Sequence, residues 1–182
     1  GRNLTTEEAS RLAQTLNDKV KLTNPPAEFI FKNTTAHRAV LLIKKYNGNL
    51  SGEITNTDPA YDKVEGIGIA KREAGNKIEK CQAMVDTENA KAAAKLVNEF
   101  TEKSQTILQQ HETNLKRISE SKPPANAILM RDAGDALPKF PSITSLYGIK
   151  FGSMVEMPVE RGIALLCGMK EINLHPQTGN LT

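Results

Sequence analysis

Two arginines stand where predicted strands begin or end, and their side chains are suited to hold an anionic ligand. Arg38 opens the apolar stretch 39–43 directly after His37, and Arg131 follows the apolar stretch 127–130 at the start of a glycine-containing turn. A guanidinium group is planar and donates two parallel hydrogen bonds to a carboxylate or a phosphate. Open α/β sheets place ligands at such strand ends. A phosphorylated hydroxy acid would suit such arginines as a ligand, but the spacing alone favours arginines that lie on the surface or in salt bridges.

A third candidate is Asp58, which lies in the polar turn 55–59 just before Pro59. A carboxylate there can accept a hydrogen bond from a substrate hydroxyl or take part in proton transfer. An aspartate before a proline is also a common turn former. Spacing alone does not raise Asp58 above a turn former.

The sequence lacks the motifs of a complete catalytic centre. His37, His111 and His175 stand alone, and Cys81 and Cys167 have neither CxxC spacing nor a local histidine partner. Metal sites and activated nucleophiles need several such groups brought together. Neither a Walker lysine pattern nor a Gly-x-Ser-x-Gly motif occurs. We expect no metal site in this chain.

The bulk composition narrows the class of protein. Of the 182 residues, 38% are hydrophobic and 25% are charged, which is typical of a globular chain. Lys and Arg number 24 against 21 for Asp and Glu, an excess too small to indicate a nucleic-acid surface. No apolar run reaches the roughly 20 residues that span a bilayer. With two distant cysteines, the chain is predicted to be cytoplasmic, with neither nucleic-acid nor membrane partners.

The first third of the chain predicts a helix followed by a hairpin. Thr5 supplies an N-cap hydroxyl, and apolar residues recur at helical spacing up to Lys19. Stretches 28–31 and 38–43 are typical of strands, and the second is apolar enough to be a central strand. The turn 33–37 is short enough to join them as an antiparallel hairpin.

The middle of the chain alternates an irregular region with a long helix. Region 47–86 is rich in glycine and without periodicity, so it is either a lid or binding loop or a set of short strands. Apolar residues at steps of three or four predict one amphipathic helix over 87–119, with His111 packed on its apolar stripe. The apolar stretch 126–130 predicts a compact buried strand.

The last part again predicts helices between strands. Short elements are expected at 142–147 (helix) and 150–155 (strand), and a helix should start at Pro158 and end at Gly168 before a strand at 169–173. Strands alternating with helices indicate an α/β class, a layered α/β/α domain with a mixed sheet. We expect residues 1–182 to form one domain.

Six segments, in this order and spacing, resemble those of a known family: GRNLTTEEA (1–9), AHRAVLLI (36–43), LSGEITNTDP (50–59), LVNEFTEKS (96–104), PPANAILMRDAG (123–134) and YGIKFGSMVEMPVERGIALLCGM (147–169). Together they are similar to the archaeal branch of cofactor-independent phosphoglycerate mutases, over nearly the whole chain. Members of that family insert a substrate-binding domain into a metal-binding domain that resembles alkaline phosphatases. The resemblance implies that 1–182 is the inserted domain.

The resemblance also implies an activity for the parent enzyme. The family's enzymes are isomerases of glycolysis and gluconeogenesis that interconvert 3-phosphoglycerate and 2-phosphoglycerate through a phosphoserine, using two divalent metals, manganese or magnesium. Their metal ligands and serine have no counterpart in this chain, so the isolated domain is expected to be inactive. Its partners would be the phosphoglycerates and the metal-binding domain of the same parent chain.

Carried over to individual residues, the resemblance makes Arg38 and Arg131 anion clamps. It places His37 and Asp58 near the reacting hydroxyls, and Arg2 is a further candidate for substrate binding. Two alternatives remain. The parent could be another alkaline-phosphatase-superfamily enzyme acting on a different phosphoester, because a fold does not fix a substrate. The chain could also be a non-catalytic module that binds RNA or another anion, although its lysines are dispersed.

Overall fold

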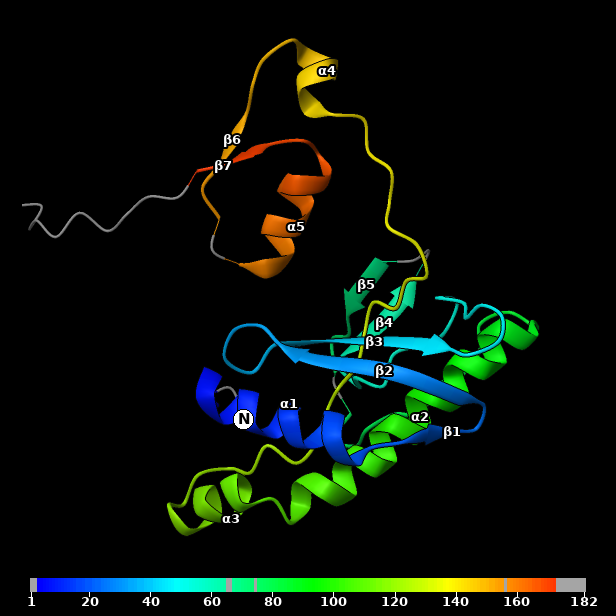
Figure 1. Cartoon of the computed structure of the whole chain (residues 1–182), viewed down its shortest axis with the longest axis vertical. Coiled ribbons are helices and arrows are strands. Elements are labelled where there is room, and N and C mark those ends of the chain that lie inside the picture. Colours follow the sequence, from blue (N-terminus) through cyan, green and yellow to red (C-terminus); the bar gives the residue numbers. More distant parts are fainter. Residues whose placement is uncertain (1–2, 65–66, 74, 156, 173–182) are drawn as a thin grey trace, which may run out of the picture. The chain divides into compact units, whose positions relative to one another are not determined.

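The computed structural model describes residues 3–64, 67–73, 75–155 and 157–172. The chain divides into two compact units, Gly1–Asp135 and Ala136–Thr182. Figure 1 shows the elements of both. Unit 1 contains α1 (Thr6–Lys19), β1 (Leu22–Thr23), β2 (Pro26–Asn33), β3 (Ala39–Lys45), β4 (Tyr61–Val64), β5 (Ile67–Ala70), α2 (Glu88–Gln109) and α3 (Glu112–Ser119), and unit 2 contains α4 (Ile143–Tyr147), β6 (Gly152–Ser153), α5 (Pro158–Leu166) and β7 (Lys170–Glu171).

Helix α1 has the boundaries that the sequence predicts, and its first turn is closed by a capping box. The Thr5 hydroxyl accepts the Glu8 N–H at 3.2 Å, and the Glu8 carboxylate accepts the Thr5 N–H at 2.9 Å. Two backbone donors that a helix start leaves unpaired are thereby satisfied. The predicted apolar face of α1 is buried: Ala9, Leu12, Ala13 and Leu16.

The predicted hairpin is confirmed, but the prediction that its second strand is central is wrong. Strands β2 and β3 pair antiparallel over seven residue pairs, from Ala27↔Lys45 to Asn33↔Ala39, and the sheet order β1-β2-β3 makes β2 the central strand. In β3 the side chains of Val40 and Leu42 are 58% and 61% exposed. The apolar run suggested burial on both faces, whereas one face of this antiparallel sheet meets the core and the other meets solvent.

The predicted single helix over 87–119 is wrong in one respect, because it breaks at Gln110 and His111. His111 adopts an extended backbone and caps α3, its Nδ1 accepting the Thr113 N–H at 3.1 Å. Its Nε2 lies 3.0 Å from the Thr15 hydroxyl of α1. The prediction that His111 packs is confirmed, since the side chain is half-buried and burial lowers its pKa.

Two further predictions concern the middle of the chain. Region 47–86 does contain short strands, because β4 and β5 pair antiparallel and Ile54 bridges to Ala83. The predicted buried strand over 126–130 is wrong: this segment has no strand assignment, and Leu129 is 47% exposed. Its Met130 N–H donates to a side-chain hydroxyl and not to a neighbouring strand.

The main core of unit 1 lies between the covered face of the hairpin and the helices α1 and α2. The rings of Phe29 and Phe31 lie 5.2 and 5.6 Å from that of Phe100, which is fully buried. A second, smaller cluster joins α2 to the region before it, through Ile54, Cys81, Ala93 and Ala94. Helix α2 thus holds both the hairpin and the irregular region in place.

Unit 2 is a small β-α-β arrangement in which β6 and β7 are parallel and α5 lies between them in sequence. The predicted helices are confirmed as α4 and α5, and Gly168, with φ of +72°, follows the end of α5 as expected. The strands are shorter than predicted, with two residues each. Residue 173 of the predicted last strand lies outside the described residues.

The α/β class is confirmed, with helices and with both antiparallel and parallel strands. Instead of one mixed sheet, the described strands form three small sheets. None of the helices in the described residues has both the length and the apolar character needed to cross a membrane.

Candidate functional site

Arg131 and Asp58 are brought together where the segment after Met130 crosses the turn 55–59. Thr57 fixes this crossing, because its N–H donates to Met130 O and its hydroxyl accepts the Met130 N–H, both at 2.8 Å. The Asp58 N–H also donates to Met130 O, at 3.2 Å. Thr57 is fully buried. Two of the predicted site residues therefore flank the same buried contact.

A buried amide adds a second connection between the two segments. The Asn56 side chain accepts the Asp132 N–H through Oδ1 and donates to Tyr61 O through Nδ2, each at 3.1 Å. Asn56 is only 5% exposed, so these bonds are shielded from water. Asp132 has φ of +60°, a conformation that aspartate tolerates better than most residues. The position of Arg131 is thus fixed on both sides.

The turn after Arg131 is clamped by a lysine and by a close backbone approach. Lys63 Nζ donates to Gly52 O and to Ala133 O, and the Gly52 N–H donates to Asp135 Oδ2 at 3.0 Å. A Cβ on Gly52 would lie 2.7 Å from the Gly134 Cα, so only glycine fits there. This close approach explains why the residue after Ser51, in the predicted binding region, is a glycine.

The guanidinium of Arg131 remains accessible. Its Cζ lies 4.0 Å from the ring centroid of Tyr61, and its Nε is 3.6 Å from Asp132 Oδ2, with 44% of the side chain exposed. An ion pair of that length and exposure contributes little. The side chain is therefore held by an aromatic face, and its N–H donors can still reach an anion.

Asp58 is half-buried and forms the local turn that its position before Pro59 suggested. Its Oδ1 accepts the Ala60 N–H at 3.0 Å. A carboxylate has two oxygens and about four acceptor positions, so this bond does not exhaust it. Asp58 can shape the turn and also accept a hydrogen bond from a ligand hydroxyl.

His37 and Arg38 lie at another place in unit 1, the turn between β2 and β3 (Figure 1). Arg38 is exposed, and its carbonyl accepts the Thr34 N–H at 2.9 Å. The Ala36 N–H donates to the Thr6 hydroxyl, which attaches the turn to the start of α1. The convergence of Arg38 with Arg131 on one ligand stays a prediction. Arg2 lies outside the described residues.

A cavity of about 500 Å³ has Asn56, Tyr61 and Lys63 among its lining residues, but neither Arg131 nor Asp58 lines it. Asp62 and Glu79 also line it, and both pair with Lys71 Nζ, at 3.2 and 2.9 Å. The hydrogen bonds that Lys71 donates to Glu79 and Asp62 raise its pKa, so it stays charged. Its positive charge partly offsets the negative charges of Asp62 and Glu79. The cavity is large enough for a three-carbon acid.

Asn56, Tyr61 and Lys63 were not predicted from the sequence as supporting residues of the site. Each lies in region 47–86, where no helical or strand period separates buried from exposed positions. The one available indication was the polar run 55–58. Buried polar groups in such a run need hydrogen-bond partners within the protein. Here they find these partners in the segment around Arg131.

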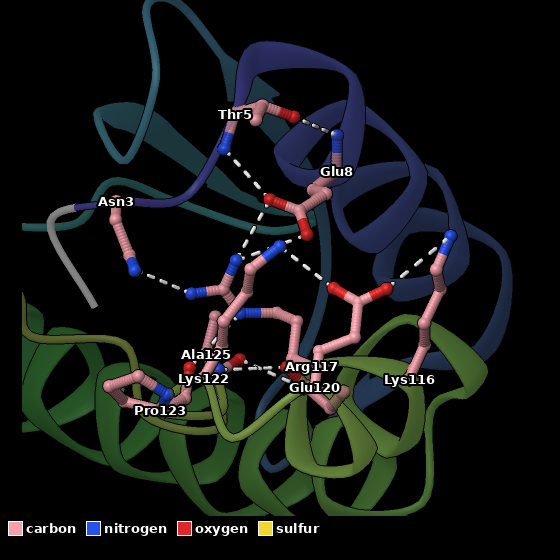
Figure 2. A network of polar contacts seen from close by, with 10 residues as sticks. Asn3, Thr5, Glu8, Lys116, Arg117, Glu120, Lys122, Pro123 and Ala125 are labelled. Atoms are coloured by element: carbon pink, nitrogen blue, oxygen red, sulfur yellow. Dashed lines mark hydrogen bonds and ion pairs between the residues drawn. The ribbon is translucent and has the colours of Figure 1, made fainter.

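Another arginine that the sequence did not single out, Arg117, is also held in a polar network (Figure 2). Its Nη1 donates to both oxygens of Glu8, at 3.0 and 2.9 Å, its Nη2 to Asn3 Oδ1 and its Nε to Pro123 O. Hydrogen bonding from the Thr5 backbone and from Arg117 lowers the pKa of Glu8 against the opposing effect of burial. Arg117 is 1% exposed, so it joins α3 to α1 and is not open to a ligand.

The donor set of the described residues does not fit a metal site. Nowhere in the described ranges do three His, Cys, Asp or Glu side chains gather closely enough to hold an ion. Both cysteines are free thiols, Cys81 buried and Cys167 half-buried. What the site offers is hydrogen bonding and positive charge.

Comparison with known proteins shows which family this chain is similar to. A family model described as 2,3-bisphosphoglycerate-independent phosphoglycerate mutase matches residues 1–114. Curated enzymes of that description are 39% identical over 176 residues in Aeropyrum pernix and 35% identical over 171 residues in Methanosphaera stadtmanae. These matches cover 96% and 94% of this chain but 41% and 38% of the relatives. The chain thus spans about two fifths of the length of those relatives.

A solved structure of a cofactor-independent phosphoglycerate mutase from Thermoplasma acidophilum has a similar fold. It superposes with a TM-score of 0.56 at 24% identity, covering 92% of this chain and 41% of that one. At this identity the likeness concerns the fold alone.

Proposed function

The chain belongs to the family of 2,3-bisphosphoglycerate-independent phosphoglycerate mutases, and from this membership we propose that it is the substrate-binding domain of such an enzyme. Its ligand would be 3-phosphoglycerate or 2-phosphoglycerate. The observation that supports the proposal is the hydrogen bond from the Asp58 N–H to Met130 O, the residue before Arg131, whose side chain is 44% exposed. In this proposal residues 1–182 belong to the inserted domain, and the parent enzyme works in cytoplasmic glycolysis and gluconeogenesis.

The reaction explains why such a domain needs both charges. A phosphoryl group would pass from one hydroxyl of the glycerate to a serine elsewhere in the parent enzyme and return to the other hydroxyl. Between the two transfers the glycerate has to stay bound, otherwise water would take the phosphoryl group and the enzyme would act as a phosphatase. Arg131 would hold the carboxylate or the phosphate, and Asp58 would accept a hydrogen bond from a free hydroxyl.

Other roles in the proposal fall on residues farther from this contact. Arg38 would supply a second anion clamp from the β2–β3 turn, with His37 near the ligand, and Arg2 is a further candidate. The two divalent metals of the family, manganese or magnesium, would be bound by the metal-binding domain of the parent, since the described residues offer no fitting ligand set.

Titration of the 182-residue chain with 3-phosphoglycerate, followed by calorimetry, tests the proposal. We expect saturable binding without mutase turnover. Arg131→Ala should weaken binding by about 2 kcal/mol, roughly thirtyfold, because a hydrogen-bonded charge pair is lost. Arg11→Ala is the matched control, an exposed arginine on α1, and should bind as the wild type does.

Four results would contradict the proposal in different ways. Absence of binding by the wild type would remove phosphoglycerate as the ligand. Equal binding by Arg131→Ala would remove this arginine from the site. Metal-dependent turnover by the pure chain would show that a catalytic centre lies within it. Saturable binding of another phosphoester in preference to 3-phosphoglycerate would favour a different enzyme of the alkaline phosphatase superfamily.

A further inference from the structure

We propose that Tyr61 is a positioning residue that sets the orientation of the Arg131 guanidinium for anion binding. The inference rests on the proposed function and adds a residue to its site. The distance of 4.0 Å between the Arg131 Cζ and the Tyr61 ring centroid is that of a guanidinium stacked on an aromatic face. An arginine stacked in this way keeps its N–H donors at the rim of the guanidinium plane, where a carboxylate or phosphate can meet them.

The ring itself is held in place by its backbone. Tyr61 opens β4, pairs with Ala70 of β5, and donates its N–H to Asp58 O at 3.3 Å. Its carbonyl accepts from the buried Asn56 side chain, whose other end accepts the N–H of Asp132. One amide therefore fixes both the residue that carries the ring and the residue that follows Arg131. The stacked pair is preorganised before any ligand arrives.

This arrangement compensates for the exposure of Arg131. A half-exposed arginine samples many rotamers, and fixing them on binding costs affinity. Asp132 provides only the distant contact to Nε at 3.6 Å. The ring of Tyr61 limits rotation of the guanidinium plane, and so two parallel hydrogen bonds to an anion can form with less loss of entropy.

The test uses the full 182-residue chain and two variants of the same tyrosine. Tyr61→Phe keeps the aromatic face and should bind 3-phosphoglycerate within twofold of the wild type. Tyr61→Leu removes the face while keeping an apolar side chain, and should bind about three- to fivefold more weakly. Tyr46→Leu, at a tyrosine that is 66% exposed, is the matched control and should have no effect.

A double-mutant cycle separates positioning from a general structural role. In an Arg131→Ala background, Tyr61→Leu should weaken binding no further, because the ring would act only through the arginine. An equal loss in both backgrounds would overturn the inference. So would wild-type affinity in Tyr61→Leu, a result that leaves the proposed function intact.

A measurement without ligand makes the inference independent of the identity of the substrate. In the nuclear magnetic resonance spectrum of the free chain, a ring beneath the guanidinium shifts the Arg131 Nε–H resonance upfield. The shift should persist in Tyr61→Phe and disappear in Tyr61→Leu. If the wild type failed to bind 3-phosphoglycerate, the proposed function would be wrong, and this spectrum would still decide whether the Tyr61 ring holds the Arg131 guanidinium. An unchanged resonance in Tyr61→Leu would overturn that role.

Discussion

The guanidinium groups of Arg117 and Arg131 lie in opposite surroundings. Arg117 is 1% exposed and directs its donors to Glu8, Asn3 and Pro123, whereas the side chain of Arg131 is 44% exposed over an aromatic ring. A guanidinium cannot be deprotonated in a protein, so a buried one has to be paired. Residue type alone does not tell a structural arginine from a binding one. The two roles differ in whether the N–H donors of the guanidinium are already bonded within the protein.

The stability of unit 1 should depend on Arg117. Arg117→Ala removes both bonds to Glu8 and leaves that carboxylate, 16% exposed, without its charged partner. We expect a loss of about 3–5 kcal/mol in the free energy of unfolding, measured by urea denaturation. Lys116→Ala is the control next to it, since the Lys116 side chain is 77% exposed, and its effect should stay within about 0.5 kcal/mol. Equal effects of the two variants would contradict a structural role for the Arg117 network.

Among the elements, the junction between α2 and β1 depends on one carboxylate. Glu99 of α2 accepts the N–H groups of Thr23 and Asn24, the Thr23 hydroxyl and the ammonium of Lys103. Burial raises the pKa of Glu99, but the hydrogen bonds from Lys103, Thr23 and Asn24 outweigh it and bring the pKa to about 2. The carboxylate thus holds the end of β1 only while it is ionised.

The sign of the resulting pH dependence follows from the lowered pKa. Below its unfolded value of 4.5, the unfolded chain takes up the proton while the folded chain does not, so acid favours unfolding until the pH approaches about 2. Glu99→Gln should lower the free energy of unfolding by up to about 3 kcal/mol at pH 7, with the difference shrinking towards pH 2.

Urea unfolding of both proteins at a series of pH values between 2 and 7 measures this effect. Glu102→Gln changes an exposed carboxylate of the same helix and should behave as the wild type at every pH. A constant difference between wild type and Glu99→Gln across this range would show that ionisation of Glu99 does not contribute.

Local signals explain which elements could be predicted from the sequence. The boundaries of α1 follow from Thr5 and Glu8, and the β2–β3 hairpin follows from two apolar stretches separated by a short turn. The break between α2 and α3 has no such signal, because His111 continues the apolar spacing of the helix. It caps α3 by accepting the Thr113 N–H, and its other ring nitrogen contacts Thr15, far away in sequence.

The candidate site also contains some residues that could be predicted from the sequence and others that could not. Arg131 and Asp58 were predicted because their side chains suit an anionic hydroxy acid, and the structure shows the Asp58 N–H bonded to the carbonyl of Met130, the residue before Arg131. The predicted strand before Arg131 was wrong because the partner of Met130 is the side chain and backbone of Thr57, not a strand. Tyr61 could not be selected, since its role depends on a contact between segments 70 residues apart.

At the scale of the whole molecule, the two units differ in how much core they possess. Both core clusters of the described chain are made of residues from unit 1. In the described part of unit 2 only Ala164 and Ser153 are buried, whereas Tyr147, Val159 and Leu165 are more than half exposed. A two-stranded sheet with little buried surface has marginal stability at best.

Unit 1 should therefore fold and bind ligand without unit 2. A chain of residues 1–135 retains both clusters, the Arg117 network and the proposed site residues Arg38, Asp58 and Arg131, so its thermal midpoint should stay within about 3 °C of the full chain, a shift below 1 kcal/mol. Its affinity for 3-phosphoglycerate should be unchanged. Residues 136–182 alone should show no cooperative transition by calorimetry, because hydrophobic burial supplies most of the driving force for folding. A shorter chain that folds but no longer binds would place part of the ligand site in unit 2, and one that fails to fold would mean that the core of unit 1 is incomplete.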